Sequence, residues 1–417
     1  MSSGTRCPIT HLRSPPQSVS VVLTTACNLG CAYCYQRRGS PRTMPWVVLR
    51  RAVELVAASG DARPVLVLYG GEPLMARNLV ERAVLLARKL EHADRPVSIR
   101  LPTNGTLLDL ELVDFLDENK VEVQLSIDGI HAAQALRSPG SYSILDDLLH
   151  DLREHRPAFL RDRVRAAVTV SSAAVTHLSD SIEYLSGFGF GEVTMTPLFS
   201  DDPGWTDTCT ETLDQELDII RTRCAWRLQE TGQISFLPLR RYRQGIQPHP
   251  GEGDTICTAP DGSRLTIDVD GSLAPCLLVA PSIAPDPPSP LAETLARLTR
   301  GAIEDPWNPT TLTGFQSDCR STGLFHDREK KYASWGRCRD CEYRDDCRPC
   351  PVATAWIPGN TDPDRIPDHL CAFNRTLAAH RRRMPAAATD LEKLRGEAPL
   401  PRALQRLLDR KPTGPAE

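Results

Sequence analysis

Three cysteines lie close together near the start of the chain, at Cys27, Cys31 and Cys34. Their spacing is C-x3-C-x2-C and they follow the apolar-rich run 19–23, so we expect a strand that leads into a short loop bearing three thiols. Three thiolates from one loop can hold three corners of a [4Fe–4S] cluster. The fourth iron then has no protein ligand, and a cofactor or substrate can bind and react there. The alternatives are a zinc site, although a structural zinc takes four protein ligands, or three buried cysteines.

A short glycine motif, Gly70-Gly71-Glu72-Pro73, ends the apolar run 65–69. Backbone carbonyls and a carboxylate at this point could receive an ammonium group, and the glycines would let a ligand or another backbone approach closely. Polar residues also follow the next two apolar runs, with Asn104 after 97–101 and Asp128 after 121–127. The plainer alternative is that the glycine motif and the Thr-Asn-Gly around Asn104 are only turns.

A second group of cysteines occupies the C-terminal half. Cys257 and Cys276 flank the run 264–275, which alternates apolar and polar residues around Asp270-Gly271 and predicts a β-hairpin. Four more cysteines follow with the spacing C-x2-C-x5-C-x2-C, and a further one stands beyond them: Cys338, Cys341, Cys347, Cys350 and Cys371. Such spacings suit a zinc ribbon as well as iron–sulfur clusters. We expect Cys7, Cys209 and Cys224 to be ordinary apolar side chains.

The elements that must position these residues alternate between strand and helix. Short apolar runs predict six strands, at 19–23, 65–69, 97–101, 121–127, 164–170 and 193–195. Apolar residues at three- and four-residue intervals predict helices at 45–58, 78–90, 110–118, 144–154 and 175–187, with further helices at 208–228 and 372–384. This order implies an α/β fold with a parallel sheet. Six units are fewer than a full barrel has, so we expect an open, partial (β/α)6 TIM-like barrel with its chemistry at the C-terminal ends of the strands.

The chain is expected to divide into four parts. Residues 17–235 would form the partial barrel, 236–250 a connector, 251–375 a cysteine-rich extension with a β-hairpin and small helices, and 376–417 a C-terminal helix and tail. Metal clusters are expected to replace a hydrophobic core in the extension, because it has few long periodic segments.

Composition limits the range of functions. The 417 residues are 41% hydrophobic, which allows a sizeable core, and the net charge of −4 argues against general nucleic-acid binding. No apolar run approaches the ~20 residues of a membrane span, and no secretory signal is visible, so we expect a cytoplasmic protein. With such short, clustered spacings, the 14 cysteines suit metal ligation better than disulfides.

Around Cys27–Cys34 the sequence resembles the radical S-adenosylmethionine (SAM) enzymes, whose loop carries an aromatic residue before the last cysteine, here Tyr33. The resemblance implies that Gly70-Gly71-Glu72-Pro73 holds the SAM amino group. It also implies that Ser126 and Asp128 contact the ribose and the methionine moiety, with Asn104 as a further cofactor contact. Arg137 would bind the SAM carboxylate through its two-pronged guanidinium; the alternative is a solvated surface arginine.

The C-terminal cysteines resemble the SPASM extension, which holds two auxiliary [4Fe–4S] clusters. By this resemblance Cys257, Cys276 and Cys350 would bind the first auxiliary cluster, which makes three clusters in all with the SAM-binding one. The second would be bound by Cys338, Cys341, Cys347 and Cys371. Cys319 is the candidate for the ligand that the first cluster lacks, unless that position is open to substrate. The family has three residues before the fourth cysteine of the run, whereas this chain has two.

The resemblance implies reductive cleavage of SAM to a 5′-deoxyadenosyl radical that removes a hydrogen from a substrate carbon. SPASM enzymes act mostly on peptides, so we expect a ribosomal peptide maturase that forms an intrapeptide C–C, thioether or ether crosslink. Its partners would be a peptide or protein substrate, a discrete leader-binding protein, and an electron donor such as flavodoxin or ferredoxin. We expect no separate leader-binding domain before the first strand.

Other functions remain open. Sulfatase maturases, which make formylglycine, place an Asp directly after the cysteine that ends the hairpin, where this chain has Leu277 after Cys276 and therefore no general base. The same machinery could instead dehydrogenate a small molecule. From another class, the chain could be a metal carrier without SAM chemistry.

Overall fold

We describe the protein from a computed structural model. It describes residues 16–36, 39–231, 235–239, 264–284, 300–302, 336–343, 346–347, 350 and 366–384. Two of the predicted cluster ligands, Cys257 and Cys319, lie outside these residues, as does Cys7.

Six parallel strands form the centre of the structure, as predicted. They lie in the order β6-β5-β4-β3-β2-β1, and their bounds are β1 Ser18–Thr24, β2 Val65–Gly70, β3 Ser98–Thr103, β4 Val121–Ser126, β5 Val164–Val170 and β6 Glu192–Pro197. Successive side chains alternate between buried and half-buried along β5, because neighbouring residues of a strand point to opposite faces. The buried face carries the β-branched and aliphatic residues that pack under the helices.

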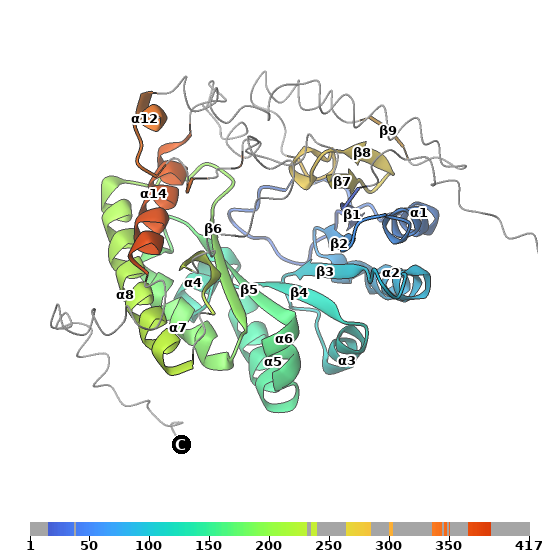
Figure 1. Cartoon of the computed structure of the whole chain (residues 1–417), viewed down its shortest axis with the longest axis horizontal. Coiled ribbons are helices and arrows are strands. Elements are labelled where there is room, and N and C mark those ends of the chain that lie inside the picture. Colours follow the sequence, from blue (N-terminus) through green and yellow to red (C-terminus); the bar gives the residue numbers. More distant parts are fainter. Residues whose placement is uncertain are drawn as a thin grey trace, which may run out of the picture.

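Helices cover the outer, convex side of this curved sheet (Figure 1). The predicted helices are α1 Trp46–Ala57, α2 Arg77–Leu90, α3 Leu110–Glu118, α5 Ser141–His155, α7 Leu178–Phe188 and α8 Asp207–Thr231. Two helices of the barrel were not predicted, α4 His131–Arg137 and α6 Pro157–Arg163, because seven residues show too little periodicity to be recognised. Short 3-10 turns complete the set, at η2 Pro73–Ala76, η3 Val175–His177, η4 Leu237–Leu239 and η6 Leu277–Val279.

The predicted hairpin is present, and it extends the same sheet. Strand β7 (Arg264–Ile267) pairs in parallel with the free edge of β1, from Ser18 opposite Arg264 to Val21 opposite Ile267. Strands β8 (Ser272–Ala274) and β9 (Arg300–Ala302) follow in antiparallel order, so that within the described residues the sheet has nine strands. The sequence did not predict this junction, which makes the partial barrel continuous with the start of the cysteine-rich region.

A C-terminal helix, α14 (Asp368–Arg383), packs against α8, and a one-turn helix, α12 (Gly336–Arg339), precedes it in the chain (Figure 1). The imidazole Nε2 of His380 lies 2.9 Å from an Asp214 carboxylate oxygen, and Arg381 donates to the carbonyl of Pro238. The helix begins at Asp368, four residues before the predicted start at 372. Among the described residues, no helix is both long and apolar enough to cross a membrane.

Candidate active site

The three-cysteine loop leaves the C-terminal end of β1, with Cys27 and Cys34 exposed and Cys31 half-buried. Partial burial raises the pKa of the Cys27 and Cys31 thiols, and the charges of neighbouring thiolates raise it further. Cys31 also lies close enough to the Arg137 guanidinium for that cation to lower its pKa in part. The three thiols therefore lie near one another and near a positive charge, although among the described residues no three His, Cys, Asp or Glu side chains are grouped closely enough to hold a single metal ion. Such a donor set fits a cubane cluster, in which each thiolate binds a different iron.

The glycine motif lies directly against the start of this loop. The backbone N–H groups of Gly71 and Glu72 donate to the carbonyls of Thr24 and Ala26, each at 2.8 Å. A Cβ atom on Gly70 would lie 2.5 Å from the Thr24 oxygen, and one on Gly71 would lie 2.3 Å from the Ala26 oxygen. Only glycine allows the two backbones to come this close. The motif thus fixes the chain that leads into Cys27.

The Glu72 side chain has a structural role that the sequence did not predict. The carboxylate was expected to face an ammonium, but Glu72 is fully buried and accepts hydrogen bonds from within the protein. Its Oε1 accepts from Leu74 N–H and the Thr103 hydroxyl, and its Oε2 accepts from Asn104 N–H, at 2.7–3.0 Å. Burial raises the pKa of Glu72, and these hydrogen bonds offset the shift in part. The carboxylate therefore joins the ends of β2 and β3.

Asn104 contacts the cysteine loop directly. Its side-chain nitrogen Nδ2 lies 2.9 Å from Asn28 Oδ1 and 3.9 Å from the Cys27 sulfur. The loop is therefore held by side chains from the end of β3 as well as by the backbone of the glycine motif. Asn104 therefore contacts the cysteine loop through its side chain, in addition to lying in the turn that its Thr-Asn-Gly sequence indicates.

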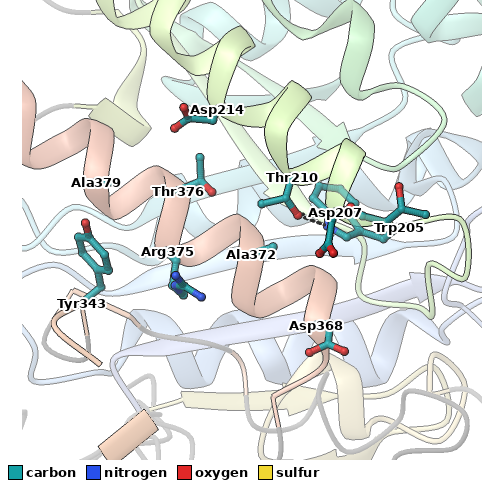
Figure 2. Close-up of a pocket in the computed structure, with 11 residues that line it drawn as sticks. Trp205, Asp207, Thr210, Asp214, Tyr343, Asp368, Ala372, Arg375, Thr376 and Ala379 are labelled. Carbon is teal, nitrogen blue, oxygen red and sulfur yellow. Dashed lines mark hydrogen bonds between the residues drawn. The ribbon is translucent and has the colours of Figure 1, made fainter. Parts of the chain in front are cut away.

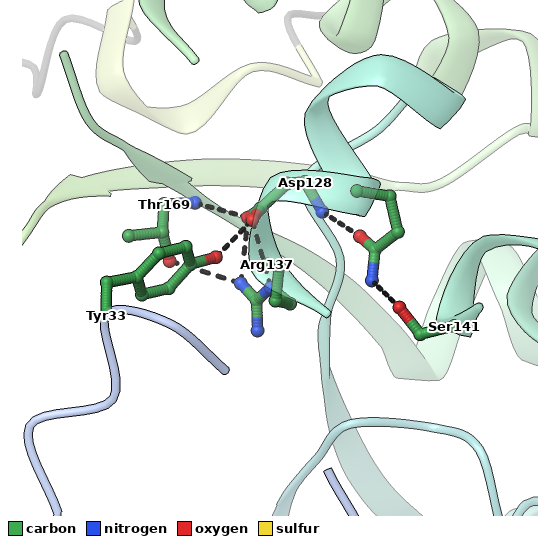
Figure 3. A network of polar contacts seen from close by, with 6 residues as sticks. Tyr33, Asp128, Arg137, Ser141 and Thr169 are labelled. Atoms are coloured by element: carbon green, nitrogen blue, oxygen red, sulfur yellow. Dashed lines mark hydrogen bonds and ion pairs between the residues drawn. The ribbon is translucent and has the colours of Figure 1, made fainter. Parts of the chain in front are cut away.

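Tyr33, Asp128, Arg137 and Thr169 form one polar network on the other side of the loop (Figure 3). Asp128, which is 2% exposed, accepts hydrogen bonds from both Nε and Nη2 of Arg137, at 3.0 and 2.8 Å. It also accepts hydrogen bonds from the Tyr33 hydroxyl and the Thr169 N–H. Burial by itself lowers the pKa of the Arg137 guanidinium, but the Asp128 carboxylate and other nearby negative groups raise it, and the net shift is upward.

Arg137 is therefore not a solvated surface arginine. Its side chain is buried, and its two-pronged face is taken by Asp128 rather than left for a ligand carboxylate. Among the described residues, no group accepts a hydrogen bond from Nη1 of Arg137. The Arg137 carbonyl also accepts the Ala32 N–H at 3.1 Å, so this residue anchors the cysteine loop twice. Ser126, at the end of β4, is half-buried.

Sequence reasoning missed a pair of tyrosines next to the two motifs. Tyr35 follows Cys34 and Tyr69 precedes Gly70, and their hydroxyl oxygens lie 2.5 Å apart. Gln36 Nε2 donates to the Tyr69 hydroxyl and to the Gly70 carbonyl, both at 3.1 Å. Burial raises the pKa of both phenols. Their position, adjacent to each motif in the sequence, was the signal that could have identified them.

The auxiliary cysteines that the structure describes are mostly sheltered. Cys276 follows β8 and is half-buried, as are Cys341 and Cys350, whereas Cys347 is buried. Cys338 and Cys371 belong to one small apolar cluster with Ile366 and Leu370, which brings together two of the ligands predicted for the second auxiliary cluster. Of the cysteines expected to be ordinary side chains, Cys224 lies in the main core and Cys209 packs against it.

A separate cavity of about 670 Å³ lies between α8 and α14 (Figure 2). Its walls include three carboxylates and one guanidinium, from Asp207, Asp214, Asp368 and Arg375. None of its lining residues belongs to the Cys27 loop, so it is separate from the candidate active site.

Comparison with known proteins gives the following relationships. Residues 21–171 match the sequence model of the Radical SAM superfamily. A cysteine-type anaerobic sulfatase-maturating enzyme of Clostridium perfringens is 35% identical over 124 residues, which are 28% of this chain and 34% of that protein. The sporulation killing factor maturation protein SkfB of Bacillus subtilis is 26% identical over 181 residues, 42% of this chain and 40% of that protein.

The structure described as native anSMEcpe with bound AdoMet and Kp18Cys peptide superposes with a TM-score of 0.64 at 18% identity, covering 90% of this chain and 100% of that one. This likeness supports the fold, including the cysteine-rich C-terminal region. The aligned segments span between about a third and just over half of the length of the curated relatives that the chain matches first.

Proposed function

Because this chain is a radical SAM enzyme, we propose that it is a peptide maturase that oxidises a ribosomal peptide by closing an intrapeptide bond. The observation that carries the proposal is the position of the three-cysteine loop, which follows β1 and whose entry is hydrogen-bonded to the glycine motif that ends β2. The peptide class is supported by the printed names of the relatives, which include a sulfatase-maturating enzyme and the maturation protein SkfB.

Cys27, Cys31 and Cys34 would hold the SAM-binding [4Fe–4S] cluster, and the described auxiliary cysteines would hold the further clusters together with Cys257. When bound, SAM and these clusters supply a 5′-deoxyadenosyl radical for hydrogen removal and a sink for the electron that leaves as the new bond closes. The protein holds the reacting groups and excludes water around them.

The chain's own residues have separable tasks in this proposal. Gly70, Gly71 and Glu72 fix the entry to the cysteine loop, and their backbone would receive the SAM amino group. Arg137 would offer Nη1 alone to the SAM carboxylate, since Nε and Nη2 are engaged with Asp128 and Thr169. This is a single-pronged contact, in place of the two-pronged capture expected from the sequence.

Formylglycine formation is the alternative reaction, and the hairpin residues argue against it. Leu277 follows Cys276 and begins the η6 turn, so no carboxylate stands there to act as a base. The two aspartates of the hairpin are engaged elsewhere. Asp268 is buried and accepts from Ser282, while Asp270 accepts from Ser272. An oxidative crosslink that uses the auxiliary clusters fits these residues better.

The test is anaerobic reconstitution with iron and sulfide, followed by incubation with SAM and a reductant. We expect 5′-deoxyadenosine in the products, whereas a metal carrier would release none. Co-expression with a short peptide encoded beside the gene should then give a peptide lighter by two hydrogens and carrying an internal link by tandem mass spectrometry. An aldehyde on a cysteine or serine of that peptide would support formylglycine formation and refute the crosslink.

The remaining partners are part of the same proposal. A flavodoxin or ferredoxin would supply the reducing electron, and a discrete leader-binding protein would present the peptide.

A further inference from the structure

The side-chain amide of Asn104 makes an unusual contact with a predicted cluster ligand. Its Nδ2 lies 3.9 Å from the sulfur of Cys27, a long contact that remains within reach of a hydrogen bond to the large sulfur atom. Its other close partner is Asn28 Oδ1 at 2.9 Å. One N–H of the amide therefore donates to Asn28, and the other is available to donate to the Cys27 sulfur.

The orientation of this amide is fixed by its neighbours. Asparagine oxygen and nitrogen are distinguished by their hydrogen-bond partners, and here Oδ1 accepts both the N–H and the hydroxyl of Thr106, at 3.0 and 2.7 Å. Asn28 Nδ2 donates to the same Thr106 hydroxyl at 2.8 Å, which closes a ring of three side chains. Flipping the amide would set its nitrogen against two donors, so the N–H groups must face the cysteine loop.

The backbone of Asn104 is held as firmly as its side chain. Its N–H donates to Glu72 Oε2 at 2.7 Å, and the next residue, Gly105, donates to the Thr103 hydroxyl at 3.0 Å. Gly105 has a φ of +79°, and a Cβ atom there would lie 2.3 Å from Leu125. The turn is therefore rigid, and Asn104, which is 9% exposed, has little freedom to leave Cys27.

Resting on the function proposed above, we propose that Asn104 is a positioning residue that donates a hydrogen bond to the Cys27 sulfur and makes the SAM-binding cluster easier to reduce. Hydrogen bonds to ligating sulfurs stabilise the more negatively charged, reduced state and are one of the levers that set a cluster's potential. Asn104 would thus act on the cluster through its ligand, which differs from a direct contact with SAM.

The test compares two variants of the reconstituted full-length chain, Asn104→Leu and Thr106→Val. Leucine keeps the approximate size but removes the N–H, whereas valine at 106 breaks the ring and leaves the Asn104 N–H in place. Both are titrated anaerobically by electron paramagnetic resonance, following the signal that changes when SAM is added, because that signal belongs to the cluster on the Cys27 loop. We expect the midpoint potential to move in the negative direction in Asn104→Leu and to stay near wild type in Thr106→Val.

Equal shifts in both variants would mean that the ring merely holds the loop, and no shift in Asn104→Leu would mean that no such bond exists; either result overturns the proposal. If Asn104→Leu fails to take up iron, Asn104→Ser, whose shorter side chain cannot reach the sulfur, is titrated in its place with the same expectation. The potential is measured without turnover. A wild-type protein that holds a SAM-responsive cluster yet forms no 5′-deoxyadenosine would therefore refute the proposed function. The midpoint potentials of the variants could still be compared in that case.

Discussion

The buried ion pair between Asp128 and Arg137 gives the sharpest test of how the cysteine loop is held. Replacing Asp128 with Asn keeps the shape but leaves the Arg137 guanidinium, whose side chain is 8% exposed, without its charge partner. The change also places an amide N–H among the donors from Tyr33, Arg137 and Thr169. Breaking such a buried pair from one side costs about 3–5 kcal/mol, because the remaining charge stays buried.

The chain carries a matched control at its surface. Arg156 binds Asp114 through the same two nitrogens, Nε and Nη2, at 2.5 and 2.7 Å, but both side chains are more than a third exposed. Exposed ion pairs are screened by water and contribute little to stability, so Asp114→Asn should change the stability little. The two variants differ in burial while sharing their chemistry.

The assay is urea unfolding of both variants beside the wild type under reducing, anaerobic conditions. We expect a clear loss for Asp128→Asn and a shift close to the experimental error for Asp114→Asn. The double variant Asp128→Asn/Arg137→Met should recover part of the loss, because it removes the uncompensated charge. Equal losses for the two single variants, or no recovery in the double variant, would refute the view that Arg137 is a buried, paired anchor of the loop.

Three further outcomes follow from residues of the described structure. Cys27→Ala should lower the iron content by roughly one four-iron cluster and abolish 5′-deoxyadenosine formation, while Cys224→Ala, in the core, should keep both; equal iron in the two variants would contradict the ligand assignment. Gly71→Ala places a Cβ atom 2.3 Å from a backbone oxygen of the loop, so it should cost about 1–3 kcal/mol in urea unfolding, whereas Gly60→Ala meets nothing within 4 Å and should be nearly neutral. Burial lowers the pKa of His380, so the folded state binds its proton less readily than the unfolded chain, whose histidine pKa is about 6.5. Stability should therefore be fully present above about pH 6.5 and fall as the pH is lowered through that value, and His380→Gln should flatten this fall in thermal unfolding followed from pH 8 to 5.5.

The sequence predicted the parts of the fold that have a strong period. All six parallel strands were recognised, because each is a short apolar run followed by turn residues such as Gly70 or Asn104. The hairpin at 264–274 was recognised from alternation around Asp270-Gly271. The short helices α4 and α6 were missed, since one or two turns leave no periodic signal.

The candidate site was predicted in its residues and only partly in their contacts. The loop cysteines and the glycine motif do lie together, since the structure puts the ends of β1 and β2 side by side. Glu72 accepts hydrogen bonds from Thr103 and Asn104, and Arg137 is paired with Asp128. These contacts depend on which side chains meet after folding. Such partners come from different elements of the fold, for example Arg137 from α4, and the sequence pattern of one element carries no information about another.

The position of β7 has a consequence for shortened forms of this protein. With β7 on one side and β2 on the other, β1 has hydrogen-bonded neighbours along both of its edges. Cutting the chain before residue 264 would uncover a run of unsatisfied N–H and C=O groups on the strand that leads into the cysteine loop. Exposed edges of this kind invite pairing with other molecules. The barrel and the hairpin should therefore be expressed together, because a barrel truncated at that point would tend to aggregate through the strand closest to its chemistry.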